Sequence, residues 1–360
     1  MNRSTEIATA TVRQTSRFDQ EEEAGEHAEQ TPLQTVTPVG TLISKVPPSL
    51  CLPPKPQYHI STTFHTELLL NDEKPDIVLI SSDNVLFCVH KFFLRSASSN
   101  AFNGLLGVDA TGAGTGTTAG SNWVAVPASS ILFNVVLHAI YKVSCKWFDP
   151  PLEILLQAVG TLKTYGISID EVVKYNTPLY DHIVAKTPED PVEVFLVAAE
   201  NNLDALAVTT SAHLHSLLLP QITDEMAKRM GPRYLKRLLK LHADRLNYLK
   251  QLLLDAPKPH ARTLECKPAD QRVLAQAWAL AISNLACQVR PDMPASALQS
   301  AFGSLEELLH CDACKMALNV RVRQLILDWS MNAKSTISAT SDDLEIVLPF
   351  SYLLSSNTLG

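Results

Sequence analysis

Two short apolar runs joined by turn residues, with a helical pattern directly after them, constrain this fold more than any other feature. Residues 76–80 and 85–89 are apolar and contain several β-branched side chains, and residues 81–84 between them have the composition of a tight turn. Together they predict a β-hairpin. After His90 the apolar residues recur at one-turn spacing, so we expect the chain to change there from strand to helix.

The rest of the chain is mostly helical in pattern. A third strand is predicted at 123–126, before the longer helices begin. Pro, Gly and Asn residues separate the helical segments, and no fixed repeat relates them. The predicted helices are 90–97, 100–106, 131–141, 152–165, 170–184, 191–201, 203–219 and 232–254. We therefore expect an α+β domain with a small sheet, followed by an all-α region.

Three segments lack such patterns. Residues 1–62 are rich in Pro, Glu and Thr and are predicted to form a disordered arm. Residues 107–121 are Gly-rich, but a phosphate-binding loop needs a strand before it and a helix after it, and here the order is reversed and Lys is absent. We interpret this segment as a flexible insertion. Residues 331–360 are predicted to be a tail.

Composition narrows the class of protein. The chain has 360 residues and a formal net charge of −7, which argues against direct binding of nucleic acid. No apolar run reaches the roughly 20 residues of a membrane span, and no signal peptide opens the chain. The seven cysteines are odd in number and widely spread, which favours a reducing compartment. We expect a soluble cytoplasmic or nuclear protein.

No catalytic motif is visible. The sequence contains no nucleophile elbow, no His-Glu-x-x-His, no P-loop and no dinucleotide fingerprint after a strand. We therefore expect a protein that is not an enzyme.

The order of hairpin, His-Lys, helix, strand and paired helices resembles a BTB/POZ domain. The residues from Phe87 onward follow the pattern F-x-V-H-K-x-x-L-x-x-x-S, and a Tyr-Gly pair closes the later leucine-rich helix. The resemblance covers 63–187, and 188–330 is similar to the helical extension of many fungal BTB proteins. The signature positions are Asp76, Phe87, His90, Lys91, Leu94, Ser98 and Tyr165.

This resemblance implies a protein–protein interaction module that forms a homodimer and acts as an adaptor or scaffold. It leaves two other roles open: a substrate-recruiting adaptor of a cullin-type ubiquitin ligase, and a transcription-associated regulator that works through partners. We expect the helix after His90, with the segment before Asp76, to supply the self-associating face. Phe92, Phe93 and Leu94 line either this face or the core.

The resemblance also suggests roles for three polar residues. It implies that His90 is structural and bonds locally at the start of its helix. Asp76 and Lys91 match positions that form a charged pair near the dimer interface in some family members. A carboxylate that heads an apolar strand must in any case be paired or solvated, because desolvating it is costly.

One group of residues has metal-like spacing. Cys311 and Cys314 form a Cys-x-x-Cys pair, preceded by His310, with Cys266 and Cys287 upstream. A structural zinc takes four such ligands, but the two-residue spacing occurs only once here. We expect no cofactor, and the alternative is a structural zinc bound by Cys266, Cys311 and Cys314; unliganded thiols explain the same pattern.

The predicted helix 232–254 is basic and amphipathic. Its leucines recur on one face, and lysines and arginines surround them. We interpret it as a helix whose leucines pack in the domain and whose basic face meets solvent. A membrane surface or an acidic partner would fit the same pattern.

Overall fold

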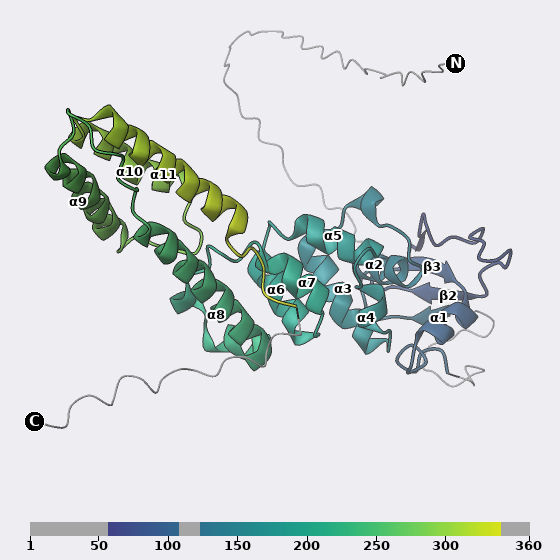
Figure 1. The fold of residues 1–360 in the computed structure, drawn as a ribbon. Coiled ribbons are helices and arrows are strands. Elements are labelled where there is room, and N and C mark those ends of the chain that lie inside the picture. The colour runs from purple at the N-terminus through teal and green to yellow at the C-terminus, as the bar shows by residue number, and fades with distance from the viewer. Residues whose placement is uncertain (1–56, 108–122, 340–360) are drawn as a thin grey trace, which may run out of the picture. The chain divides into compact units, whose positions relative to one another are not determined.

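The structure is a computed structural model that describes residues 57–107 and 123–339 (Figure 1). The predicted insertion at 107–121 lies almost wholly outside these ranges. Most of the predicted arm at 1–62 and much of the predicted tail at 331–360 also lie outside them. Within the described residues a small sheet is combined with many helices, so the α+β class is confirmed.

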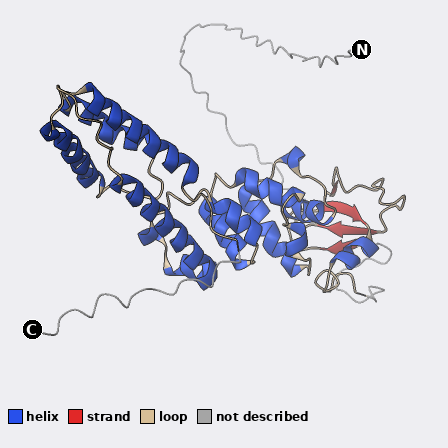
Figure 2. Cartoon of the chain, viewed as in Figure 1, coloured by secondary structure: helices blue, strands red, loops and turns tan. Residues whose placement is uncertain are grey.

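Short strands form one mixed sheet, drawn as red arrows in Figure 2. The strand order is β1-β3-β2-β4. β2 (Ile77–Ile80) and β3 (Val85–Val89) pair antiparallel, which confirms the predicted hairpin. β1 (His59–Ile60) lies parallel to β3, and β4 (Trp123–Ala125) lies parallel to β2.

The hairpin is attached to the first long helix, α2 (Ser130–Ile140), by apolar and polar contacts. The ring of Phe87 packs edge-on against Phe133, with ring centroids 5.2 Å apart. In the turn, the Asp83 carboxylate accepts hydrogen bonds from the Ser130 backbone N–H at 2.8 Å and from its hydroxyl at 2.6 Å. The turn residues therefore also satisfy a donor at the start of α2.

The described helices agree largely with the predicted segments, although some predicted segments correspond to two shorter elements each. The helices that begin at Pro178, Pro191 and Pro268 each have this Pro in the first turn, where its missing N–H costs nothing. No helix among the described residues combines the length and apolar character needed to cross a membrane. The remaining helices are α1 (Lys91–Ala97), α3 (Leu152–Thr164), α4 (Ile169–Val172), α5 (Pro178–Lys186), α6 (Pro191–Glu200), α7 (Asp204–Ser211), α8 (Asp224–Leu254), α9 (Pro268–Leu285), α10 (Ala295–Gly303) and α11 (Asp312–Asn332), with short 3-10 turns η1 (Lys146–Phe148), η2 (Leu219–Gln221) and η3 (Ser304–Leu308).

Buried apolar side chains form two separate cores. The first joins the sheet to the helices from α1 to the middle of α8. The second is formed by the C-terminal end of α8 together with α9, α10 and α11. Leu238 and Leu241 of α8 belong to the first core, and Leu249 and Leu253 belong to the second. Helix α8 therefore contributes to both.

The predicted short helix 100–106 is wrong. Ala101, Phe102 and Asn103 all have positive φ, between 53° and 58°, so the chain turns in the left-handed region. The Ser98 hydroxyl accepts the Phe102 N–H at 2.7 Å, and the Asn100 side chain accepts the Asn103 N–H at 2.7 Å. These side chains replace helical carbonyls as acceptors, which favours a turn over a helix.

Two predicted boundaries are also wrong. Strand β1 lies inside the segment predicted as a disordered arm, because its backbone pairs with the edge of β3. At the other end, Ile337 lies inside the predicted tail but is only 2% exposed. Its N–H donates to the Ser211 hydroxyl at 3.0 Å, so this part of the chain packs on the first core.

The basic face of α8 does not simply meet solvent, as its pattern suggested. The Arg237 side chain is only 4% exposed and pairs with Asp204 at 2.5 Å. The Arg245 guanidinium lies over the Trp329 ring, 4.7 Å from its centroid. Gly231, with φ of 66°, and Pro232 divide the helix into two segments, so the predicted start at residue 232 coincides with a break. These arginines act in packing rather than as a free basic surface.

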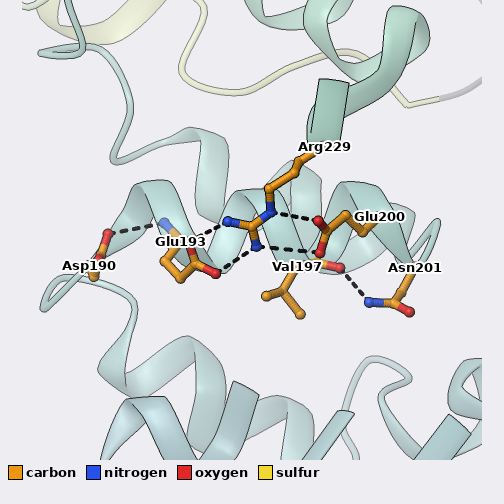
Figure 3. Close-up of polar contacts among 6 residues, drawn as sticks. All are labelled: Asp190, Glu193, Val197, Glu200, Asn201 and Arg229. Atoms are coloured by element: carbon orange, nitrogen blue, oxygen red, sulfur yellow. Dashed lines mark hydrogen bonds and ion pairs between the residues drawn. The ribbon is translucent and has the colours of Figure 1, made fainter. Parts of the chain in front are cut away.

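Arg229, before this break, joins α8 to α6 (Figure 3). Its two terminal nitrogens donate to both oxygens of Glu193, at 2.9 and 2.6 Å. Its Nε donates to Glu200 at 2.5 Å. The two carboxylates raise the pKa of Arg229. Planar, bidentate pairing of this kind is the geometry in which Arg binds carboxylates most strongly.

Replacing Arg229 with Met is expected to lower the free energy of unfolding by about 1–2 kcal/mol, because two carboxylates lose a partly buried partner. Urea unfolding followed by circular dichroism measures the change. Arg233→Met is the matched control, because Arg233 is 43% exposed and its ion pair with Asp204 is long, at 3.5 Å. Equal effects for the two variants would contradict this role of Arg229.

Candidate functional site

A cluster of cysteine and histidine side chains lies beside the second core. His260, Cys266, Cys311 and Cys314 each offer one ligand atom, and all four atoms lie within 4.8 Å of one another. The first two residues come from the connection between α8 and α9, and the other two from the start of α11. The cluster therefore joins two segments that are distant in sequence.

The cluster is compact. The Sγ atoms of Cys266 and Cys314 are 3.8 Å apart, and Cys311 Sγ is 3.5 Å from His260 Nε2. A disulfide bond would place its sulfurs about 2.05 Å apart, so these are free thiols. Cys266 and Cys314 are each only 1% exposed, whereas Cys311 and His260 are half-buried.

Local structure positions each of these side chains. Cys311 is the N-cap residue of α11, and Cys314 follows in the first turn of the helix. The Cys266 N–H donates to the Thr263 hydroxyl at 3.1 Å, just before Pro268 begins α9. The Cys266 thiol lies against the first turn of α11, where its sulfur contacts that of Cys314.

The loop also orients His260. Gln271 of α9 donates to the His260 carbonyl at 3.0 Å. The ring Nδ1 lies 2.6 Å from the carbonyl oxygen of Ala261. A carbonyl can only accept, so Nδ1 is the donor in this contact. The other ring nitrogen, Nε2, faces Cys311.

The environments of the three thiols differ. The backbone N–H groups of Cys314 and Ala313 at the start of α11 lower the pKa of Cys311 to about 7. Burial raises the pKa of Cys266, and burial raises the pKa of Cys314 to about 12. Backbone N–H groups at the start of a helix stabilise a thiolate. An apolar environment destabilises a thiolate that has no cation beside it.

Three of the predicted ligands are thus brought together, and two other candidates are not. Cys287 and His310 are exposed and lie outside the cluster. His260 was missed in the sequence. The only signal was its position six residues before Cys266, in a Pro-rich connection, and neither feature is specific to a metal ligand.

The signature residues lie in another part of the chain, around α1. The Asp76 carboxylate accepts the backbone N–H of Lys91 at 2.6 Å, so it caps the first turn of α1. Within the described residues, no ion pair joins Asp76 to the Lys91 ammonium group, so the charged pair of some BTB/POZ family members is not formed here. The backbone N–H takes the place of the side chain because Asp76 faces the open end of the helix.

His90 has a structural role, although its partners are not local. Its side chain is buried, with Nδ1 3.1 Å from the Tyr141 hydroxyl and Nε2 3.1 Å from the Glu73 carbonyl. The backbone N–H of His90 also donates to Tyr141, at 3.0 Å. His90 therefore joins the start of α1 to the end of α2 and to the segment before β2.

The other signature residues belong to the first core or border it. Leu94 and Phe87 are 0% and 1% exposed. The Ser98 hydroxyl donates to the Tyr165 carbonyl at 2.6 Å, and the Tyr165 ring stacks on Phe102 with centroids 4.2 Å apart. These contacts hold the end of α1 against the end of α3.

Comparisons with family models, with characterised proteins and with solved structures found no match for this chain.

Proposed function

We propose that this chain is a protein–protein interaction module of the BTB/POZ kind, which self-associates through α1 and acts as an adaptor or scaffold. The observation that carries the proposal is the exposure of Phe92. This side chain is 81% exposed, while the next residues, Phe93 and Leu94, pack inward. A second copy of the chain that covered Phe92 would remove a large apolar surface from water.

The segment before β2 adds to this face. Glu73 lies against the start of α1, because its carbonyl is 3.1 Å from His90 Nε2. Leu69 in the same segment is 56% exposed. An apolar face made by α1 and this segment is the one that the resemblance to BTB/POZ domains implies.

Contacts at both ends of α1 support a binding role. Asp76 caps its start, and Ser98 ties its end to Tyr165. Leu94 anchors its buried side. A surface that is already ordered loses less conformational entropy on association, so a helix held in this way is suited to bind a partner.

The test is the solution mass of the full chain by light scattering across a concentration series. The wild-type protein is expected to have twice the chain mass of 39.5 kDa. Phe92→Asp is expected to weaken self-association at least about 100-fold, because a carboxylate would be buried without a partner at the interface.

The matched control is Tyr175→Asp, since Tyr175 is 65% exposed on the connection between α4 and α5. This variant should remain a dimer, and both variants should keep the unfolding temperature of the wild-type protein. A wild-type monomer at every concentration would overturn self-association. A Phe92→Asp variant that still dimerises like the wild type would remove α1 from the interface.

A further inference from the structure

We propose that His260, Cys266, Cys311 and Cys314 bind one structural Zn²⁺ ion, which ties the α8–α9 connection to the first turn of α11. This site is independent of the proposed self-association, because none of its residues belongs to α1 or to the segment before β2. The proposal adds His260 to the three cysteines that the sequence suggested.

Two of the six distances between the ligand atoms match a tetrahedral centre, and all six lie within 4.8 Å. Zinc–sulfur bonds of about 2.3 Å and zinc–nitrogen bonds of about 2.05 Å, at tetrahedral angles, separate two sulfurs by about 3.8 Å and a sulfur from a nitrogen by about 3.6 Å. The observed Cys266–Cys314 and Cys311–His260 separations are 3.8 and 3.5 Å. Both pairs are therefore already at the spacing of zinc ligands.

The orientation of His260 provides a second observation. A histidine that binds a metal through Nε2 usually donates its other N–H to a carbonyl or carboxylate. Here Nδ1 donates to the Ala261 carbonyl, and Nε2 faces Cys311. The ring is thus held in the orientation that a zinc ligand requires.

The donor set identifies the metal. Three thiolates and one imidazole are typical of structural zinc, and they leave no open position for substrate. An iron–sulfur cluster with all-cysteine ligation would need a fourth thiolate in place of His260. On binding, the three thiols release their protons to solvent, and the imidazole contributes its lone pair.

The position of the site explains what the ion would stabilise. The connection from α8 to α9 has no regular secondary structure between residues 256 and 267. Cys266 and Cys314 are both members of the second core, which also holds Trp278 and Phe302. One ion bound to both segments would fix the connection against the core and bring the starts of α9 and α11 together.

The first experiment measures the metal content of the full chain, purified without chelators and freed of loosely bound ions on a chelating resin. The wild-type protein is expected to retain about one zinc ion per chain, and Cys266→Ser and His260→Ala are expected to retain less than about 0.2. Cys287→Ser and His310→Ala are the matched controls and should keep the wild-type content, because both residues lie outside the cluster.

A second measurement remains informative if a ligand variant folds poorly. Cobalt(II) added to the metal-free full chain is expected to show the intense visible absorption of a tetrahedral thiolate site and a sulfur-to-metal charge-transfer band. His260→Cys replaces the imidazole with a fourth thiolate and so keeps four ligands. This variant should retain zinc and show a stronger charge-transfer band than the wild type.

The proposal would be overturned by wild-type protein that retains less than about 0.1 zinc ion per chain and gives no tetrahedral cobalt spectrum. It would also be overturned if Cys287→Ser lost the metal as completely as Cys266→Ser. A disulfide between Cys266 and Cys314 in protein purified under reducing conditions would contradict it as well. None of these results depends on whether the chain is a dimer.

Discussion

Replacing Trp278 with Ala is expected to lower the free energy of unfolding by about 3–5 kcal/mol. Trp278 is only 1% exposed and stacks on Phe302, with ring centroids 4.1 Å apart. Its Nε1–H donates to the Leu253 carbonyl at 2.9 Å. That carbonyl is one of the last in α8 and has no partner within the helix. The substitution therefore leaves both a cavity and an unsatisfied buried acceptor.

Amide hydrogen exchange shows which elements lose stability, and urea unfolding measures the decrease in the free energy of unfolding. Protection should fall first in α9, α10 and α11, because Trp278 belongs to the second core. Trp278→Phe keeps a ring but removes the hydrogen bond, and it should cost about 1–3 kcal/mol. Leu280→Ala on the same helix is the surface control, since Leu280 is 57% exposed. A Trp278→Ala variant as stable as this control would contradict the packing described.

Replacing Leu94 with Asp is expected to unfold the sheet and the helices around α1. Leu94 is 0% exposed in the first core, so even Leu94→Ala should cost about 2–5 kcal/mol. A carboxylate at this position would also be buried without a partner, which adds several kcal/mol. The total reaches the whole stability of an ordinary domain.

Phe92→Asp is the companion variant, two residues away on the same helix. It should remain folded, because Phe92 faces solvent in the single chain. Near-ultraviolet circular dichroism and exchange protection of β2 and β3 distinguish the two variants. A folded, monomeric Leu94→Asp protein would show instead that Leu94 lies on the self-associating surface.

Much of the fold could be predicted because its signals are local. The apolar, β-branched run at residues 77–80 and the turn after it predicted the hairpin, and one-turn spacing of leucines predicted α3. Pro191 marked the start of α6, and the structure adds that the Asp190 side chain caps it by accepting the Glu193 N–H at 3.0 Å. In each case the residues that decide the structure lie within a few positions of one another.

The errors arose where a distant partner decides the structure. β1 forms because the edge of β3 is available, and residues 57–62 carry no strand pattern of their own. Ile337 is buried because Ser211 and the first core receive it. Similarly, the sequence pattern of α8 could not show that Arg237 is buried and paired with Asp204. Periodicity describes one element at a time and does not identify its partners.

The candidate site shows the same division. The Cys311-x-x-Cys314 spacing by itself indicated a metal-like pair of thiols, and the structure places both in the first turn of α11. Only the tertiary structure decided that Cys266 and His260 join them and that Cys287 and His310 do not. The sequence likewise determined the hairpin and most helices, whereas packing decided which apolar residue of α1 stays exposed. Local geometry follows from neighbouring residues, but a four-residue centre depends on how the helices between its two halves pack.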